Sequence, residues 1–384
     1  MKIRSIKAKI IKNSRGEKAI QIKINRKYKA SAPSGASKGK SEVKAFPKQG
    51  IKYVVNWINK SNELKKLKFE EFKDLEIIDR YIEKIGGNPV IAIQYAILKA
   101  MSKNKVWKFL NPNAKKMPIP IGNVIGGGAH TELVSTDIQE YLLIPNAKTI
   151  YENVMLNSII HKKIGKLLGL PKKTDEGAWS PNLDNISVFN LLHSFLNDKK
   201  NTFGTKVDLG VDMAASSFYS ENKYCYINFS KDKNYENLNK KKQIEFVNQL
   251  IEDYNLKYFE DPLDENDFSG FSKISKKTLV CGDDLITTNF DRLKKAIRNN
   301  SVNCIIIKPN QIGSLIKTKR VVDLAKKNKI KIVVSHRSGE TMDAIISHLA
   351  VAWGADFLKC GIYGKERKVK LNELIKIESD IKNL

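Results

Sequence analysis

Cys304-Ile305-Ile306-Ile307-Lys308 is a run of four apolar residues that ends in a lysine. Short apolar runs that end in polar residues predict the buried strands of a parallel sheet. Four further runs of this form each end in a charged or polar cluster: Val207–Val211 before Asp212, Tyr258-Phe259 before Glu260-Asp261, Leu279–Cys281 before Asp283-Asp284, and Ile332–Val334 before Ser335-His336-Arg337. The repetition of this pattern indicates one architecture for the C-terminal two thirds of the chain.

Helical segments separate these strands, and the alternation of strand and helix favours an α/β fold built as a β/α barrel over an open sheet. In such a barrel the carboxyl ends of the strands meet at one site, so that charged residues far apart in the sequence converge there. The segment 111–120 contains three prolines and is predicted to be a linker. We therefore predict two domains, 1–115 and 116–384.

The N-terminal segment is predicted to be a small domain of mixed α+β structure. Its hydrophobic pattern indicates two strands (3–10 and 19–24), a loop of small residues (33–40) and three helices (near 48–60, 74–84 and 89–103).

The composition limits the class of protein. The chain has 384 residues, of which 41% are hydrophobic, so it can bury a core and is not disordered as its main state. No apolar run approaches the roughly 18 residues of a membrane span, and the basic N-terminus lacks the apolar core of a signal peptide. The four cysteines lie far apart without a CxxC motif, as is typical of a reducing compartment. We expect a cytoplasmic protein without a membrane span.

The formal net charge of +27 raises the question of an acidic partner. Only nine of the 68 basic residues are arginine, the residue favoured for bidentate phosphate and base contacts. The lysines are spread along the whole chain, and clusters such as 240–242 are typical of a solvated face. We therefore expect at most non-specific contact with nucleic acid.

Three carboxylates stand at successive predicted strand ends: Asp212, Glu260 and Asp283. Such a hard-oxygen set suits Mg²⁺. A single acid at a strand end also serves to cap the next helix, and this alternative remains open for each residue taken alone. Three in succession favour a metal site.

Lys308 and Lys359 stand at strand ends in the same way. A lysine held beside cations and away from water has a lowered pKa and can act as a base. We expect this of these two residues, although most lysines in such a chain lie on the surface.

Residues 335–341 supply an arginine, hydroxyls and a turn glycine, which are the components of an anion site. A helix cap with a surface arginine is the alternative. The stretch Gly126-Gly127-Gly128-Ala129-His130 permits close approach of the backbone to a ligand. It lacks the pattern of a dinucleotide-binding loop, and the chain has no P-loop motif.

The order of these motifs along the chain resembles that of the enolase family, and the resemblance covers nearly the whole sequence. The matching segments, with the family's pattern in parentheses, are Asn13–Gly16 (DSRG), Pro33–Gly39 (PSGASTG), Gly127–His130 (GG-x-H), Gln139–Tyr141 (QEF), Asp175–Gly177 (DEGG), Phe259–Leu263 (EDP), Gly282–Leu285 (DDL), Ile307–Gly313 (K-x-NQIG) and Ser335–Thr341 (SHRSGET, unchanged).

The resemblance implies a small N-terminal α+β domain followed by a TIM-like barrel of the enolase type. It implies a lyase, a phosphopyruvate hydratase, that interconverts 2-phospho-D-glycerate and phosphoenolpyruvate in glycolysis and gluconeogenesis. Enzymes of this superfamily pair a Lys or His base with Mg²⁺. Two Mg²⁺ per active site are implied, the second arriving with the substrate. The resemblance also suggests a homodimer or a higher oligomer of dimers.

Roles carried over from the family fall on particular residues of this chain. Asp212, Glu260 and Asp283 would hold the first Mg²⁺, and Ser37 of the mobile loop would join the second. The implied catalytic residues are Lys308 as base at C2, Glu176 as acid at the C3 hydroxyl, Glu140 beside it, Lys359 and His336. The implied substrate-binding residues are His130, Gln139, Glu140, Arg337, Ser338 and Lys359.

The sequence departs from the family pattern at Asn13, where the family has aspartate, and at four further places: Lys38 in the loop, Ala178-Trp179 after the acid, Pro309 after the base, and Gly364–Arg367, which keep part of an RSER-like segment. None of them removes a charge that the reaction needs. Two other functions stay open, a different lyase of the same superfamily and an enolase-like protein that mainly binds RNA or an anionic surface.

Overall fold

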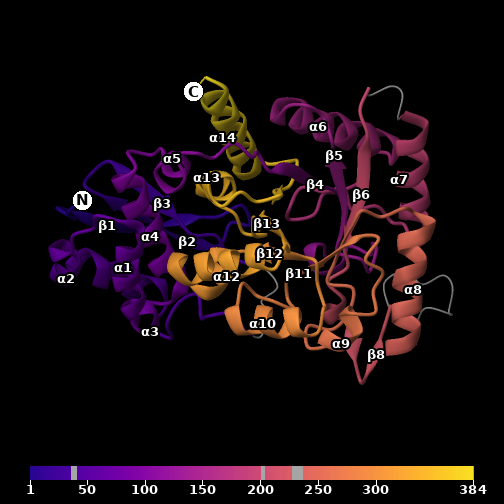
Figure 1. The fold of residues 1–384 in the computed structure, drawn as a ribbon, viewed down its shortest axis with the longest axis horizontal. Coiled ribbons are helices and arrows are strands. Elements are labelled where there is room, and N and C mark those ends of the chain that lie inside the picture. Colours follow the sequence, from indigo (N-terminus) through magenta and orange to yellow (C-terminus); the bar gives the residue numbers. More distant parts are fainter. Residues whose placement is uncertain (36–40, 200–203, 227–236, 384) are drawn as a thin grey trace.

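The computed structural model describes residues 1–35, 41–199, 204–226 and 237–383. Figure 1 shows two parts side by side, with the N-terminal elements in indigo and purple and the barrel beside them.

The N-terminal part is an antiparallel three-stranded sheet covered by helices. Ala19, Ile20, Ile22 and Ile24 of the central strand are buried, and α4 lies against this sheet and is buried nearly all round. The elements are β1 (Ile6–Lys12), β2 (Lys18–Ile24), β3 (Tyr28–Ser31), α1 (Gly50–Lys60), α2 (Asn62–Lys66), the 3₁₀ helix η1 (Phe72–Tyr81), α3 (Ile82–Ile85), α4 (Gly87–Met101) and α5 (Val106–Leu110).

Eight strands close into a barrel in the order β10-β11-β12-β13-β14-β4-β5-β6. All four residues of β12 are buried, as expected of a strand with helices outside and side chains filling the barrel inside. The strands are β4 (Ile119–Gly126), β5 (Glu140–Pro145), β6 (Val207–Asp212), β10 (Tyr258–Glu260), β11 (Leu279–Gly282), β12 (Cys304–Ile307), β13 (Lys331–Ser335) and β14 (Phe357–Lys359). The predicted fold class is confirmed.

The prediction that strands and helices alternate is wrong for the start of the barrel. β5 pairs antiparallel with both β4 and β6, whereas the other neighbours are parallel. Antiparallel neighbours need no helical crossover, so a loop that carries only the short η2 (Gly128–His130) joins β4 to β5. Two helices then follow in succession, α6 (Ile150–Leu167) and α7 (Asn185–Lys199).

The remaining helices lie outside the barrel strands. They are α8 (Lys240–Asp253), α9 (Phe268–Phe271), α10 (Phe290–Arg298), α11 (Pro309–Ile312), α12 (Leu315–Lys327), α13 (Ile345–Ala352), α14 (Lys365–Lys382) and the 3₁₀ helix η3 (Ala215–Phe218). A small sheet of β7 (Tyr219–Ser220), β8 (Lys223–Tyr224) and β9 (Leu238–Asn239) extends from the barrel.

The barrel interior is filled by side chains and is no pore. One buried cluster comprises Ile121, Leu142, Ile144, Tyr258, Cys281, Cys304, Ile306 and Val333. Because this cluster closes the barrel from within, polar groups at the carboxyl ends of the strands lie above an apolar floor.

The N-terminal domain docks on the loop that follows β13. Ser34 and Gly339 exchange two backbone hydrogen bonds of 2.9 and 2.8 Å. The Ser31 hydroxyl donates to Thr341 Oγ1 at 2.8 Å, and Lys99 of α4 pairs with Asp343 at 2.7 Å. The N-terminal domain therefore covers the mouth of the barrel beside residues 335–343.

Sequence patterns located part of the N-terminal domain and the barrel strands after residue 200, but no individual helix of the barrel. The barrel strands after residue 200, α1 and α4 lie where predicted within a few residues, but most of the expected helix at 74–84 is 3₁₀ in form. β3, α2, β4 and β5 were not predicted. The segment 111–120, taken as a linker, already contains the start of β4 at Ile119.

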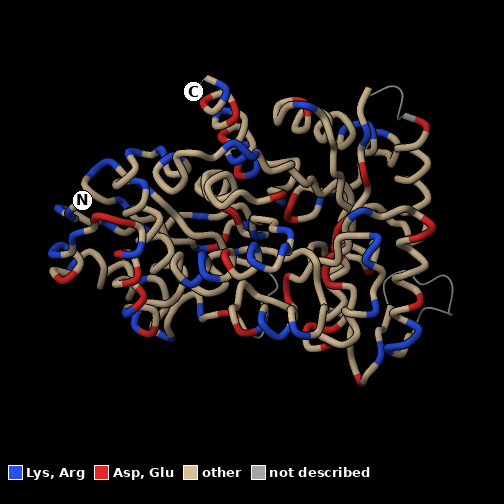
Figure 2. The backbone as a smooth tube through the Cα atoms, in the orientation of Figure 1, with Lys and Arg blue, Asp and Glu red and all other residues tan. Residues whose placement is uncertain are grey.

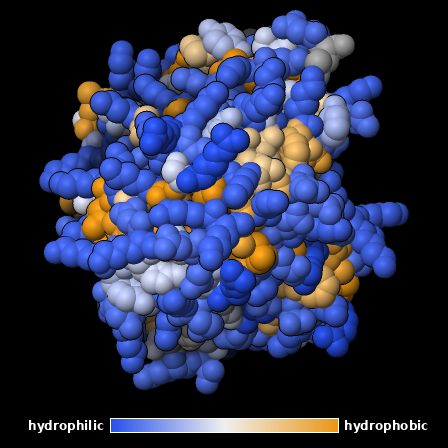
Figure 3. All heavy atoms as spheres, turned by 90° about the vertical axis from the view of Figure 1, so that its left-hand side faces the viewer, coloured by the Kyte–Doolittle hydropathy of each residue, from blue (hydrophilic) through white to orange (hydrophobic). Residues whose placement is uncertain are grey.

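The surface is polar and its charges are mixed. Figure 2 shows Lys and Arg along both domains, interspersed with Asp and Glu. Figure 3 shows hydrophilic side chains over most of the face formed by the N-terminal domain. Within the described ranges, no helix has both the length and the apolar character that crossing a bilayer requires.

Gly165 of α6 provides a test of the packing beside the loop that carries Glu176 and Trp179. A Cβ at this glycine would lie 2.2 Å from Cζ2 of Trp179. We expect Gly165→Ala to destabilise the protein by about 1–3 kcal/mol, because overpacking outweighs the roughly 0.5–1 kcal/mol that alanine contributes within a helix. Urea unfolding measures the loss.

The matched control is the same change in a Trp179→Phe background, where the smaller ring leaves space. There we expect Gly165→Ala to cost less than in the native background. An equal cost in both backgrounds would contradict the packing explanation.

Candidate active site

The carboxyl ends of the barrel strands bring the predicted site residues together. Asp212 ends β6 and pairs in register with both Glu140 of β5 and Glu260 of β10. Lys359 ends β14 next to Ser335 of β13. One pocket at this end is lined by His130, Gln139, Glu140, Glu176, Asp212, Asp283, Lys308, His336, Arg337, Ser338 and Lys359, together with Gly35, Glu42, Ala214, Asp261, Asp284, Gln311 and Ser335.

Lys359 is the centre of one charge cluster. Its Nζ lies 2.8 Å from Glu140 Oε2, 2.8 Å from Asp212 Oδ2 and 2.9 Å from Glu260 Oε2. Burial opposes the charged form, but Asp212, Glu140 and Glu260 outweigh it and raise the pKa of Lys359 well above the usual value. Lys359 is therefore an ammonium that binds three carboxylates.

Lys308 belongs to a second cluster at the ends of β11 and β12. Its Nζ pairs with Asp283 Oδ2, and Gln311 Nε2 donates to Asp283 Oδ1 at 3.0 Å. Thr288 Oγ1 in turn donates to Gln311 Oε1 at 2.7 Å and accepts from the backbone N–H of Lys308 at 2.9 Å. This closed set of contacts fixes Lys308 and Asp283 relative to each other.

The expectation of lowered lysine pKa values is wrong in this structure. Burial lowers the pKa of Lys308, but Asp283 outweighs burial, and the net shift is upward. The same holds for Lys359. The sequence showed both the lysines and the acids, but not that each ammonium would lie directly on carboxylates.

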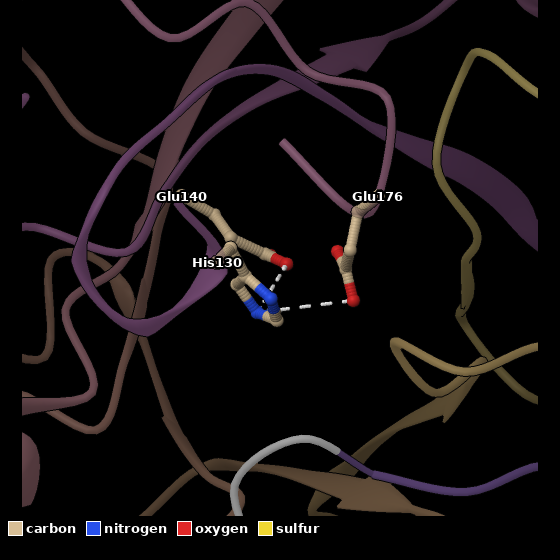
Figure 4. Close-up of side chains that lie close together, drawn as sticks. All are labelled: His130, Glu140 and Glu176. Carbon is tan, nitrogen blue, oxygen red and sulfur yellow. Dashed lines mark ion pairs between the residues drawn. The ribbon is translucent and has the colours of Figure 1, made fainter. Parts of the chain in front are cut away.

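His130, Glu140 and Glu176 form a third group, in which the three side chains point toward one another (Figure 4). His130 Nε2 lies 4.0 Å from Glu140 Oε1 and 3.8 Å from Glu176 Oε1, and Nδ1 lies 2.8 Å from Asp175 Oδ1. His336 Nε2 approaches Glu176 Oε2 from another side at 3.5 Å. A buried pair of carboxyls is thus flanked by two imidazoles.

The titration of these groups differs from side chain to side chain. Burial would lower the pKa of His130, but Glu176, Asp175 and Glu140 raise it to about 9. Burial raises the pKa of Glu140, with Glu176 adding to the shift and Lys359 opposing it. Burial would also raise the pKa of Glu176, but His130 outweighs it and the net shift is downward. Burial and Arg367 hold the pKa of His336 well below its usual value. Of the two carboxyl groups, Glu140 therefore binds a proton more readily than Glu176, and of the two imidazoles His130 is the charged one.

Arg337 marks the opposite, cationic side of the pocket. Its guanidinium binds Glu42 through both nitrogens at 3.0–3.1 Å and donates to Asn310 Oδ1 at 3.3 Å. The buried Arg367 donates to the Ser338 carbonyl at 2.8 Å. These bonds hold the 335–341 loop, so the structure places its arginine in the pocket and not on the surface.

The predicted ligands suit a hard divalent cation. Glu260 Oε1 is buried and has no hydrogen-bond partner within the described part of the chain. Such an orphaned carboxylate oxygen, beside Asp212 and near Asp283, is what Mg²⁺ prefers. In the structure, however, Asp212 and Glu260 form ion pairs with Lys359, whereas Asp283 forms one with Lys308. Ser37, the fourth predicted ligand, lies outside the described residues.

Several residues of the site were not singled out from the sequence. Asp261 accepts the backbone N–H groups of Asp283 and Asp284 at 3.1 and 2.6 Å, and its ligand atoms lie within 4.8 Å of theirs. Asp261, Asp284, Asp175 and Gln311 stand inside the quoted motifs, which could have identified them. Glu42 lies outside every motif, and no sequence signal indicated it.

Comparison with known proteins agrees with this geometry. Residues 114–384 match the family described as Enolase, C-terminal TIM barrel domain. The chain belongs to the enolase family. As a member of this family it is an enzyme of the lyase class, which confirms the prediction from the motifs.

Proteins named Enolase match over almost their whole length. The chain is 38% identical to the one from Methanothermobacter thermautotrophicus, with 99% of this chain and 97% of that protein covered. It is 39% identical to the one from Picrophilus torridus, with 96% of each covered, and 37% identical to the one from Methanosphaera stadtmanae, with 99% and 98% covered.

The raised pKa of His130 predicts a pH-dependent stability. Because the folded value is about 9 against 6.5 for the free side chain, the stabilisation is complete below pH 6.5 and is lost as the pH rises through 9. We expect a loss on the order of 3 kcal/mol in the free energy of unfolding. Urea unfolding at pH 6.5 and 9.5 measures it.

Other groups titrate over the same interval, so the decisive quantity is the difference between the protein and its His130→Gln variant. We expect that difference to shrink as the pH rises. A difference that stays constant from pH 6.5 to 9.5 would show that His130 is not the group responsible.

Proposed function

We propose that the protein catalyses the reversible dehydration of 2-phospho-D-glycerate to phosphoenolpyruvate, as an enzyme of glycolysis and gluconeogenesis. The observation that carries the proposal is the convergence of a lysine, a carboxyl pair and an arginine, Lys308, Glu140–Glu176 and Arg337, on one buried pocket. The relatives named Enolase, similar over nearly the full chain, support it.

The first chemical requirement is removal of a weakly acidic proton from C2. Lys308 Nζ is the proposed base, and the C2–H bond breaks as its proton passes to this nitrogen. In the structure the Lys308 ammonium is held on Asp283, so a neutral amine requires that Asp283 bind another cation. Lys359, across the pocket, would bind the substrate carboxylate.

The second requirement is departure of the C3 hydroxyl, which leaves as water while the C2–C3 double bond forms. Glu176 is the proposed acid for that oxygen. Because the pKa of Glu140 is raised and that of Glu176 is lowered, we assign Glu140 to supply the proton to Glu176. His130 and His336 contact Glu176 on both sides and line this end of the pocket.

Arg337 and Ser338 are the proposed phosphate ligands, and Gln139 lines the pocket beside Glu140. An arginine guanidinium matches the geometry of phosphate oxygens. Because Glu42 already binds both terminal nitrogens of Arg337, the substrate phosphate must share or replace this contact.

Mg²⁺ is the proposed cofactor, two ions per site, with Asp212, Glu260 and Asp283 holding the first and Ser37 joining the second. When bound, it would supply positive charge that stabilises the substrate carboxylate as the C2 proton leaves. The family implies a divalent metal, and the donor set fits one.

Pro309, one of the departures from the family pattern, is compatible with this assignment. It occupies the first turn of α11, where proline is accepted because its missing N–H would have no partner in the helix. The mixed charge along both domains gives no specific support to a role mainly in binding RNA. The homodimer and the cytoplasmic location stay predictions.

Lys308→Ala tests the assignment of the base. We expect the protein to form phosphoenolpyruvate from 2-phosphoglycerate with Mg²⁺, to stop in EDTA, and to lose at least about 100-fold in kcat in the variant. Absorbance of phosphoenolpyruvate measures all three.

Lys331→Ala is the matched control, because Lys331 also pairs with an aspartate, Asp356, but at the amino end of a barrel strand. We expect its kcat within about twofold of that of the unchanged protein, since the site lies at the other end of the strands. A folded protein without Mg²⁺-dependent activity would refute the proposed function, and an unimpaired Lys308→Ala variant would refute the base.

A further inference from the structure

His161 lies outside the barrel, on α6, and is only 3% exposed. It stacks with two aromatic rings: the Trp179 ring centroid lies at 5.0 Å and the Tyr363 centroid at 6.0 Å, both nearly parallel to the imidazole. Lys173 Nζ covers the Trp179 ring at 3.7 Å and the Tyr363 ring at 4.6 Å. The two aromatic rings thus fix the imidazole in position.

Two hydrogen bonds connect this stack to the loop that carries Glu176. His161 Nε2 lies 2.9 Å from the carbonyl oxygen of Gly177, the residue directly after Glu176, and Trp179 Nε1 donates to the His161 carbonyl at 2.7 Å. A carbonyl only accepts, so the Nε2 atom carries the proton. His161 therefore donates one hydrogen bond to the loop and accepts one from it.

The bond does not depend on a charged imidazole. Burial, helped by the nearby Lys173 and opposed by the bond to Gly177, lowers the pKa of His161 to about 4. The side chain is neutral at physiological pH, and its one N–H is the one directed at Gly177. Tyr363, the other titratable group packed on the ring, stacks on its face.

Glu176 needs such support from its backbone. Its Oε2 atom has no hydrogen-bond partner within the described residues, and the two imidazole nitrogens beside its carboxyl group lie at 3.8 and 3.5 Å, beyond normal hydrogen-bond length. Glu140 contacts the carboxyl group from the side, and the main chain of residues 174–177 sets the point from which the side chain reaches into the pocket. Gly177 has φ +85°, a left-handed conformation, and a Cβ there would lie 2.9 Å from the Tyr363 side chain.

We infer that His161 is a positioning residue for Glu176, which it places by holding the Gly177 carbonyl from outside the barrel. The inference rests on the proposed function, because the position of Glu176 matters only if this carboxyl donates a proton to the substrate. It also gives a role to a departure from the family pattern: the Trp179 indole supplies both the stacking face and the N–H that returns to His161.

Three variants of His161 separate the hydrogen bond from the packing. In His161→Gln the side-chain amide reaches the place of Nε2 and can still donate, whereas in His161→Asn it reaches only the place of Nδ1. Both lose the stacking to the same degree. His161→Phe keeps the stacking and loses the donor. Steady-state kcat and KM for 2-phosphoglycerate are measured at saturating Mg²⁺, together with thermal unfolding, beside the unchanged protein.

We expect kcat of His161→Asn and His161→Phe to fall about 10- to 100-fold, since displacement of a catalytic group by 1 Å costs up to about 100-fold. KM should stay within about threefold, because the phosphate and carboxylate contacts are untouched. His161→Gln should keep kcat at least about tenfold above that of His161→Asn, even if both unfold at the same temperature.

Equal kcat values for the Gln and Asn variants, or full activity of His161→Phe, would overturn the inference and leave His161 a packing residue. If the Phe variant does not fold, the Gln–Asn comparison decides alone. An inactive unchanged protein would instead refute the proposed function, and the inference with it, so the two failures are distinguishable.

Discussion

The site depends on one buried ammonium group. Lys359 brings Glu140, Asp212 and Glu260 within 2.9 Å of a single nitrogen, and all four side chains are at most 5% exposed. Three carboxylates this close repel one another strongly in a medium of low polarity, so they require a cation. The strand register makes the cluster possible, because Asp212 pairs with both Glu140 and Glu260 on neighbouring strands. The antiparallel placement of β5 is what brings Glu140, at the start of its strand, to the same edge.

Around this centre the pocket is divided by charge. Lys308 neutralises Asp283 on one side, His130 faces the Glu140–Glu176 pair on another, and Arg337 pairs with Glu42 on a third. Each of these ionised groups thus has an oppositely charged neighbour. Under the proposed function, a substrate or a divalent cation would enter by exchanging these contacts rather than by filling an apolar hollow. The N-terminal domain completes the wall, since its Ser31 and Ser34 bond the same loop that carries Arg337.

The sequence predicted the barrel and one part of the candidate site because strand ends in a barrel share one edge. Asp212, Glu260, Lys308 and Lys359 could be recognised as polar residues directly after apolar runs, and all four reach the site. The antiparallel start of the barrel could not be read in this way, because the pairing direction of β4 and β5 depends on contacts made later in the chain. Glu42 and His161 belong to no strand end, so only the folded structure relates them to Arg337 and Glu176. The raised pKa of Lys308 likewise depends on a distance to Asp283 that no spacing in the sequence gives.

The free energy of unfolding of Lys359→Met in EDTA is the most direct test of the central ammonium. Methionine keeps much of the side-chain volume but removes the charge, and stranding buried charges typically costs about 3–5 kcal/mol. We therefore expect a loss of about this size by urea unfolding, against less than about 0.5 kcal/mol for Lys331→Met on the barrel's opposite rim. A Lys359→Met protein as stable as the unchanged one would contradict the view that this ammonium holds the three carboxylates together.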